Sequence, residues 1–348
     1  MITKELQPGY GLWKEYKPEK APYRFRARTE ATARTWQKRT RKELEGLLGS
    51  EKSRSLSFLP KRLEWIDKGD YVREKVVIRV SKYAYMPIYI LLPKGVDRPL
   101  PAVVALHGHG YGVKDIVGLW EDGAERNIPE GYHKDFAVQL CRSGFAVAAP
   151  EISCFGERQT DFSHLNSEIG QPIPSTCTHT AMLAFHLGKS VIGLRVSEGR
   201  RLVDYLQTRS EFDVSRLGAM GISGGGMHTF FSSCLDTRFK ACVVSGYYGT
   251  FQGSVLSMNH CACNFVPGLH RFGEMYDLIG LLAPRPVLIE AANYDNIFPI
   301  AEVKKSVSRA RKVYDVFGVK SNIETDYFEG RHQISGAKAY DFLSSHLC

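Results

Sequence analysis

From residue 101 onward, short apolar segments alternate regularly with helical patterns. The apolar segments span residues 101–108, 145–151, 216–223, 240–246, 285–292 and 322–328. Between them lie amphipathic stretches such as "KDFAVQLCRSG" and "AEVKKSVSRARKVYDVFG". Strands that are apolar throughout are typical of a sheet buried on both faces, and helical crossovers allow consecutive strands to run parallel. The alternation therefore predicts an α/β fold with a mostly parallel sheet covered by helices on both faces.

Two further β-rich segments precede this alternation. The segments "EKVVIRV" and "MPIYILLP" are separated by a short polar link, which favours an antiparallel pair at the start of the sheet. We therefore expect about eight strands, within one domain over residues 61–348. Residues 109–133 and 152–190 interrupt the alternation and are polar and glycine-containing. We expect them to form cap-like loops over the carboxyl ends of the strands, where open α/β sheets bind ligands.

Residues 1–60 form a basic, helical N-terminal extension in this interpretation. They hold 14 Lys and Arg against 7 Asp and Glu, so that this segment carries +7 of the net charge of +9. An apolar helical face is formed by Ala33, Trp36, Leu44, Leu47 and Leu48. Such a face favours packing, through Trp36 and Leu44, on the main domain or on a second subunit. We therefore predict no nucleic-acid partner and leave a homo-oligomer open.

The sequence also bears on the compartment of the protein. No continuous apolar stretch is long enough for a membrane span, and the N-terminal residues lack the apolar core of a secretory signal. Several of the 8 cysteines fall in apolar segments such as "KACVVSG", where cysteine behaves as a small buried hydrophobe. We therefore expect a cytoplasmic protein with reduced thiols and no membrane partner.

One serine lies where a buried strand is expected to turn directly into an apolar helix. Gly221-Ile222-Ser223-Gly224-Gly225 closes the strand at 216–223 and is followed by "GMHTFFSSCL". A serine on such a tight turn leaves no room for side chains two positions away on either side, which explains the G-x-S-x-G spacing. The start of the following helix also presents backbone N–H groups to developing negative charge. This context favours a nucleophilic Ser223 over a glycine-rich helix start that only packs.

A serine hydroxyl needs a base and an acid that orients the base. Asp295 lies on the loop after the strand at 285–292, and His332 lies on the loop after the strand at 322–328. Glu290 and Asp326 are nearby, but both lie within strands, so that Asp295 is preferred. We therefore predict Ser223, His332 and Asp295 as a catalytic triad.

Stabilising the oxyanion of such a reaction requires two backbone N–H donors. Gly224, directly after the predicted nucleophile, should supply one of them. The second should come from "LHGHGYG", the loop after the strand at 101–108. We predict the amide of His109 as this donor, with the amide of Gly110 as the alternative.

Several motifs occur together and in a specific order. They are "LHGHG", "FGER", "GLRVSEGRRLVDYL", "MGISGGG", "CACNFVPG", "LLAPRPVLIE", "DNIFP" and "GRH". In this combination the chain, over roughly residues 70 to 340, resembles the acetyl xylan esterase-related, dienelactone hydrolase-like family of α/β-hydrolases. The resemblance implies a serine carboxylic-ester hydrolase without a metal or an organic cofactor, and Ser223, Asp295 and His332 match its triad positions. Glu151 departs from the family pattern, in which Asp is usual.

Histidine and cysteine cluster in two other segments, "HCACN" and "CTHT". Zinc sites usually pair their ligands as C-x2-C or H-x3-H, and neither spacing occurs in these segments. We therefore favour packing near the cap for these residues, and predict no metal and no cofactor. Arg158 in "FGER" could hold the cap through an ion pair or face a substrate carboxylate.

These features predict hydrolysis of short-chain, acetyl-type esters through an acyl-enzyme. The polar cap-like segments offer little continuous apolar surface for a fatty acyl chain. Two alternatives remain open. One is an acyltransferase or peptidase that uses the same triad, and the other is a non-catalytic binding protein on a hydrolase fold.

Overall fold

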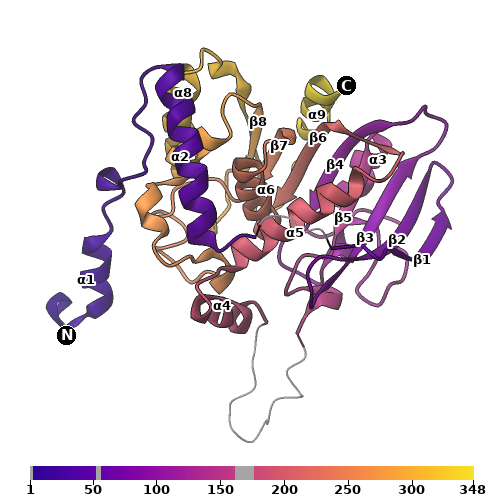
Figure 1. Ribbon diagram of the computed structural model, residues 1–348, viewed down its shortest axis with the longest axis horizontal. Coiled ribbons are helices and arrows are strands. Elements are labelled where there is room, and N and C mark those ends of the chain that lie inside the picture. Colours follow the sequence, from indigo (N-terminus) through magenta and orange to yellow (C-terminus); the bar gives the residue numbers. More distant parts are fainter. Residues whose placement is uncertain (1–2, 52–55, 161–175) are drawn as a thin grey trace, which may run out of the picture.

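The computed structural model describes residues 3–51, 56–160 and 176–348. Within these residues a nine-stranded sheet runs in the order β1-β2-β3-β5-β4-β6-β7-β8-β9 (Figure 1). The strands are β1 (Lys61–Asp67), β2 (Tyr71–Arg79), β3 (Tyr85–Pro93), β4 (Leu100–Leu106), β5 (Ala146–Pro150), β6 (Phe212–Ile222), β7 (Phe239–Ser245), β8 (Val287–Ala292) and β9 (Ile323–Phe328). The first three strands and the β3–β5 pair are antiparallel, and the remaining pairs are parallel. The predicted mostly parallel sheet is confirmed, with nine strands instead of about eight.

The additional strand is β1, which the sequence pattern did not indicate. Its sequence "KRLEWID" is largely polar, and most of its side chains are exposed. It forms one edge of the sheet and pairs with β2 alone. Charged side chains on an edge strand hinder pairing with other molecules, so such a strand does not need the apolar pattern of a central one.

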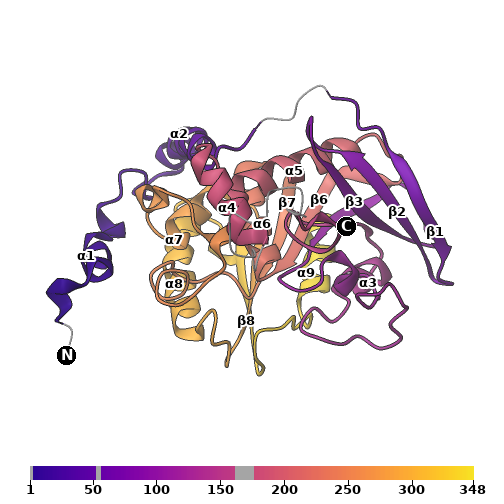
Figure 2. The ribbon, with the colours of Figure 1, turned by 90° about the horizontal axis from the view of Figure 1, so that it is seen from below.

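Helices cover both faces of the sheet. One face carries α2 (Glu30–Leu48), α5 (Val191–Leu206), α6 (Gly224–Leu235) and α8 (Ile300–Asp315), and the other carries α3 (Phe136–Arg142) and α9 (Ala339–Leu347). Figure 2 shows α5 and α9 on opposite sides of the strands. Along β4, alternate side chains enter different cores: Val104 and Leu106 join the first face, whereas Val103 and Ala105 join the second. Helix α1 (Pro8–Glu15) lies outside these two layers and α4 (Thr176–His186) lies at their margin (Figure 1), whereas the short helix α7 (Met275–Leu278) buries Met275 and Leu278 in the larger core.

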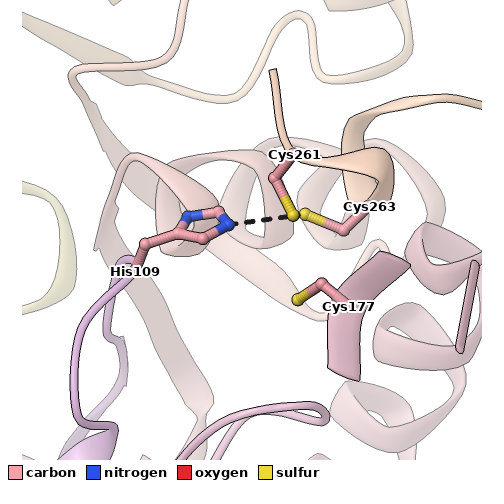
Figure 3. Close-up of side chains that lie close together, drawn as sticks. All are labelled: His109, Cys177, Cys261 and Cys263. Atoms are coloured by element: carbon pink, nitrogen blue, oxygen red, sulfur yellow. Dashed lines mark hydrogen bonds between the residues drawn. The ribbon is translucent and has the colours of Figure 1, made fainter. Parts of the chain in front are cut away.

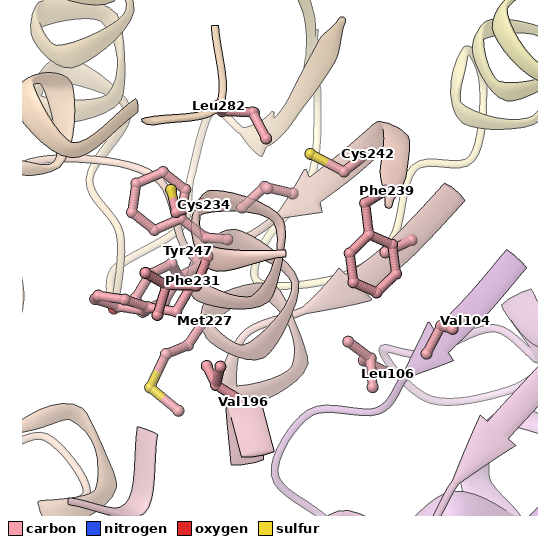
Figure 4. Packing of buried hydrophobic residues seen from close by; sticks show 14 of the residues in the cluster. Val104, Leu106, Val196, Met227, Phe231, Cys234, Phe239, Cys242, Tyr247 and Leu282 are labelled. Atoms are coloured by element: carbon pink, nitrogen blue, oxygen red, sulfur yellow. The ribbon is translucent and has the colours of Figure 1, made fainter. Parts of the chain in front are cut away.

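Helix α6 runs through the larger core. All of its residues are buried, and apart from His228 its side chains are apolar or small around the whole circumference of the helix. Met227, Phe231 and Cys234 belong to one packed cluster with Val196 and Leu282 (Figure 4). This packing fixes the start of α6, where the predicted nucleophile lies, near the centre of the molecule.

The N-terminal segment packs on the sheet domain through α2. Leu44 and Leu48 are fully buried in the larger core. Gln37 donates hydrogen bonds to backbone carbonyls of residues 280 and 283, and Trp36 packs edge-on against Phe25 with ring centroids 4.9 Å apart. Helix α2 thus shares the core of the sheet domain, and the division of the chain at residue 60 remains an interpretation of its charge. Among the described residues, no helix combines the length and the apolar character required to cross a membrane.

The two cap-like segments follow β4 and β5. The first contains the short buried turn η3 (Val113–Ile116), and the second contains η4 (Gly156–Arg158) and α4. Residues 161–175 of the second segment lie outside the described residues. Arg158 forms a two-pronged ion pair with Glu198 of α5, with one N–O distance of 2.8 Å. Of the two roles considered for Arg158, the structure shows the ion pair.

Substitution of Leu44 tests the contribution of α2 to stability. We expect Leu44→Ala to lower the free energy of unfolding by about 2–5 kcal/mol, because removal of a fully buried leucine leaves a cavity. The control is Leu12→Ala in α1, where the side chain is 67% exposed and the expected change is within about 0.5 kcal/mol. Chemical denaturation followed by circular dichroism measures both. If the free energy of unfolding changed as little in Leu44→Ala as in Leu12→Ala, α2 would lie outside the part of the protein that unfolds cooperatively.

Candidate active site

Ser223 lies on the turn between β6 and α6. Its φ of 56° and ψ of −118° are strained for a residue with a side chain. A Cβ atom at Gly221 would lie 2.4 Å from the carbonyl oxygen of Gly225, and a Cβ atom at Gly225 would lie 1.9 Å from that of Leu106. Both positions therefore require glycine, and the turn presents Ser223 at the carboxyl end of β6.

His332 and Asp295 lie together on the loops after β9 and β8. Nδ1 of His332 is 2.7 Å from Oδ2 of Asp295. The other carboxylate oxygen of Asp295 accepts hydrogen bonds from the N–H groups of Ile297 and Phe298, at 2.8 and 3.0 Å. These bonds fix the buried carboxylate, which in turn orients the imidazole. Nε2 of His332 is then the nitrogen available for proton transfer.

The two other acids considered from the sequence are engaged elsewhere. Glu290 accepts hydrogen bonds from the hydroxyl of Ser245, at 2.6 Å, and from the N–H of Gly336, at 2.7 Å. Burial raises the pKa of Glu290 above its ordinary value. Asp326 accepts a hydrogen bond from the hydroxyl of Ser335 at 2.8 Å. Of the three acids, Asp295 is the one placed against the imidazole.

Ser223 and His332 face the same cleft. The N–H of Ser223 donates to the carbonyl of Ser245 at 3.0 Å, and the imidazole lies over the adjacent Gly246, where a Cβ atom would be 3.0 Å from Cε1 of His332. Nε2 of His332 has no hydrogen-bond partner among the described residues, so its bond to the Ser223 hydroxyl is not made here. In active sites without substrate this bond is often long, and it tightens when substrate binds.

The cleft around these residues has a volume of about 360 Å³. Its apolar wall includes Met258, Ile297 and Phe298, and its polar wall includes Tyr132 and His260. The rings of Phe298 and His332 are stacked, with centroids 6.1 Å apart. Two hollows elsewhere on the molecule, of about 380 and 540 Å³, are lined by neither Ser223 nor His332. We therefore place the candidate active site in this cleft, on chemistry and not on size.

The loop after β4 brings His109 beside Gly224. Both residues line the cleft, and a Cβ atom at Gly224 would lie 3.0 Å from Nδ1 of His109. In the described part of the chain, neither backbone N–H donates to a protein acceptor. The hydroxyl of Tyr132 donates to the carbonyl of His109 and helps to hold this loop. Gly110, the alternative donor, is not among the described residues that line the cleft.

A buried polar network supports the loop after β4. The N–H of Gly108 donates to Nε2 of His133 at 2.7 Å, and Nδ1 of His133 is 2.7 Å from Oδ2 of Asp115. Arg126 pairs with the same carboxylate at 3.0 Å. Burial raises the pKa of Asp115, but the bonds from His133 and Arg126 outweigh it and lower the pKa to about 2. Sequence reasoning missed this network, because its members lie in an irregular segment without a local motif.

Glu151, the residue that departs from the family pattern, holds the same loop from another side. One of its carboxylate oxygens accepts from the N–H of Val113 at 3.0 Å and lies 3.1 Å from Nε2 of His107. A Cβ atom at Gly112 would be 2.4 Å from this oxygen. The glutamate therefore fills the space under the loop, and glycine at position 112 makes room for it.

Comparisons with known proteins give relatives in sequence and in structure. YtaP of Bacillus subtilis strain 168, whose name assigns it to the hydrolases, is 28% identical over 282 residues, which cover 79% of this chain and 86% of that protein. A protein of Bacteroides fragilis named an acetyl xylan esterase has a TM-score of 0.75 and 16% identity, covering 94% of this chain and 84% of its own. The glucuronoyl esterase of Solibacter usitatus has a TM-score of 0.65 and 14% identity, covering 95% and 100%.

At these identities the structural likeness establishes the fold. The family assignment comes from a family model that matches residues 9–328, which is nearly the whole chain. The match includes all of α2 and all of α1 except its first residue. The sheet order, the strained turn at Ser223 and the loops after β8 and β9 agree with it. The chain belongs to the Abhydrolase family and has the α/β-hydrolase fold.

Proposed function

We propose that this protein is a serine carboxylic-ester hydrolase that acts through an acyl-enzyme on short-chain, acetyl-type esters. The observation that carries the proposal is the 2.7 Å contact between Asp295 and His332 at a cleft that also contains Ser223 on its strained turn. Two structural relatives are named an acetyl xylan esterase and a glucuronoyl esterase, which supports an ester as the substrate.

Each residue has one role in the proposed reaction. Nε2 of His332 takes the proton of Ser223 as the hydroxyl oxygen attacks the ester carbonyl, and Asp295 stabilises the imidazolium that forms. The N–H groups of His109 and Gly224 donate to the oxyanion. His332 then gives the proton to the departing alcohol. Water then enters, and His332 takes a proton from it as the water oxygen attacks the acyl carbonyl. His332 gives this proton to the oxygen of Ser223 as the acid is released.

Acyl-chain selectivity tests the proposed substrate class. We expect kcat/KM for p-nitrophenyl esters to fall when the acyl chain is longer than roughly four carbons. The cleft volume of about 360 Å³ is small for a ligand-binding site, and the cleft has to hold both the acyl and the alcohol part of the ester. In a pocket with room for the chain, each buried methylene would instead favour binding by up to about 0.8 kcal/mol. A series from acetate to octanoate measures this trend. A higher kcat/KM for octanoate than for acetate would contradict the short-chain proposal.

A fluorophosphonate probe separates the proposed enzyme from a non-catalytic binding protein. Covalent labelling that maps to Ser223 supports a nucleophilic serine, whereas a folded protein without labelling supports the binding alternative. Product analysis in the presence of added alcohols distinguishes hydrolysis from acyl transfer. The cytoplasmic location and the absence of nucleic-acid and membrane partners remain predictions.

A further inference from the structure

One histidine and three cysteines lie together beside the cleft, and two of them, His109 and Cys261, line it. They are His109 after β4, Cys177 in α4, and Cys261 and Cys263 at the short turn η6 (Ala262–Asn264). Their nitrogen and sulfur atoms all lie within 4.8 Å of one another, and Nε2 of His109 is 3.7 Å from Sγ of Cys263. Figure 3 shows the imidazole and the three thiol groups turned toward a common centre.

We propose that these four side chains bind a zinc ion. With Zn–S and Zn–N distances of about 2.3 and 2.0–2.1 Å, ligand atoms in a tetrahedral site are roughly 3.5–3.8 Å apart. The widest pair in the cluster would have to approach by about 1 Å, a change within reach of side-chain rotation. Three cysteines and one histidine form a closed site without a free coordination position, which is typical of structural zinc. On binding, the three thiols release three protons.

A buried arginine next to the cluster supports a negative charge at this place. Arg195 of α5 is fully buried, and its Nη2 lies 3.8 Å from Sγ of Cys177 and 3.2 Å from the carbonyl oxygen of Ser153. Nε and Nη1 of Arg195 have no hydrogen-bond partner among the described residues, and Glu198, one turn further along the same helix, pairs with Arg158 instead. A buried cation without a counter-ion is costly. Zn²⁺ with three thiolates and a neutral imidazole carries a net charge of −1, which would balance Arg195.

This proposal replaces the interpretation that these residues only pack near the cap. That interpretation was based on the spacing of ligands within "HCACN" and within "CTHT". The fold instead takes two ligands from the first segment, one from the second and one from the loop after β4. Spacing within a single segment cannot detect such a site. Three neutral thiols around the imidazole would also be weak hydrogen-bond partners for His109 and Arg195.

The ion would connect three segments at or next to the cleft. It would join the loop after β4 to α4 and to the turn η6. Since the backbone N–H of His109 is a proposed oxyanion donor, a ligand bond to its side chain would help to fix that donor. The metal site itself does not depend on the proposed esterase activity, and its tests are independent of turnover.

Metal content of the full-length protein is the first test. The protein should be produced in zinc-containing medium, purified under reducing conditions without a polyhistidine tag, and dialysed against metal-free buffer. We expect one zinc ion per chain by elemental mass spectrometry. Protein produced with Co²⁺ should show thiolate-to-cobalt charge-transfer absorption and the visible bands of tetrahedral cobalt. A metal-free protein, or a cobalt form without thiolate absorption, would overturn the proposal.

Substitutions test the ligand set. Cys261→Ser and Cys263→Ser should each reduce the zinc content to less than a tenth. The control is Cys154→Ser, which changes a buried cysteine that contacts Cys177 but does not belong to the four ligands, and it should retain the full content. Circular dichroism establishes whether each variant is folded, and the cobalt spectrum of the unsubstituted protein tests the site without any variant. Unchanged zinc in folded ligand variants, or lost zinc in the control, would contradict the assignment.

Discussion

Ser223→Ala is expected to lower kcat for p-nitrophenyl acetate by about 10⁶-fold, with a much smaller change in KM. Alanine removes the proposed nucleophile, and it fits the same turn because its Cβ atom occupies the place of the serine Cβ. The neighbouring Gly221 and Gly225, which the turn requires, are unchanged. The remaining rate should exceed that in water by roughly 10³–10⁴-fold, because the oxyanion donors and substrate binding remain.

Ser257→Ala is the matched control for this substitution. Ser257 directly precedes Met258, which lines the cleft, but Ser257 itself is not among the described residues that line it. The hydroxyl of Ser257 donates to the carbonyl of Ser254 at 3.3 Å. We expect its kcat to stay within a few-fold of the unsubstituted protein. Retention of more than a hundredth of the turnover in Ser223→Ala would show that another group acts as the nucleophile.

The sheet could be predicted because its central strands are apolar on both faces. Such strands carry a strong local signal, and the helices between them show the helical period. Strand β1 was missed because an exposed edge strand lacks that signal. Helix α2 was expected from the apolar face around Leu44, but its position in the core depends on contacts with residues 280 to 283, more than 230 positions away.

The three proposed triad residues could be predicted because fold topology restricts where such residues can lie. The nucleophile turn has a local sequence requirement, which the glycines at 221 and 225 satisfy. Asp295 and His332 follow two adjacent parallel strands, β8 and β9, whose carboxyl ends lie at the same edge. Position after a strand was therefore enough to bring the acid and the base together.

Residues that act through tertiary contacts could not be predicted in this way. His133 supports the loop after β4 from a segment without regular structure. The four proposed zinc ligands come from three segments that are 68 or more residues apart, and the buried Arg195 comes from a fourth. Each of these residues resembles an ordinary core or loop residue when its own segment is considered alone.

Asp295→Asn is expected to lower kcat by roughly 10⁴-fold while the protein stays folded. The amide oxygen of asparagine can still accept from the N–H groups of Ile297 and Phe298, so the loop after β8 keeps its hydrogen bonds. The amide NH₂ would then face Nδ1 of His332 as a donor. This arrangement favours the tautomer that carries its proton on Nε2, which cannot accept the proton of Ser223.

Asp326→Asn is the matched control, since it makes the same chemical change in an acid of β9, the strand before the loop that carries His332. Asp326 accepts from the hydroxyl of Ser335 at 2.8 Å, and among the described residues the acid that pairs with His332 is Asp295. We expect its kcat to fall no more than a few-fold, and thermal unfolding shows whether either variant has lost stability. Steady-state kinetics with p-nitrophenyl acetate compares the two. A loss in Asp326→Asn as large as that in Asp295→Asn would mean that the 2.7 Å contact with His332 is not what orients the base.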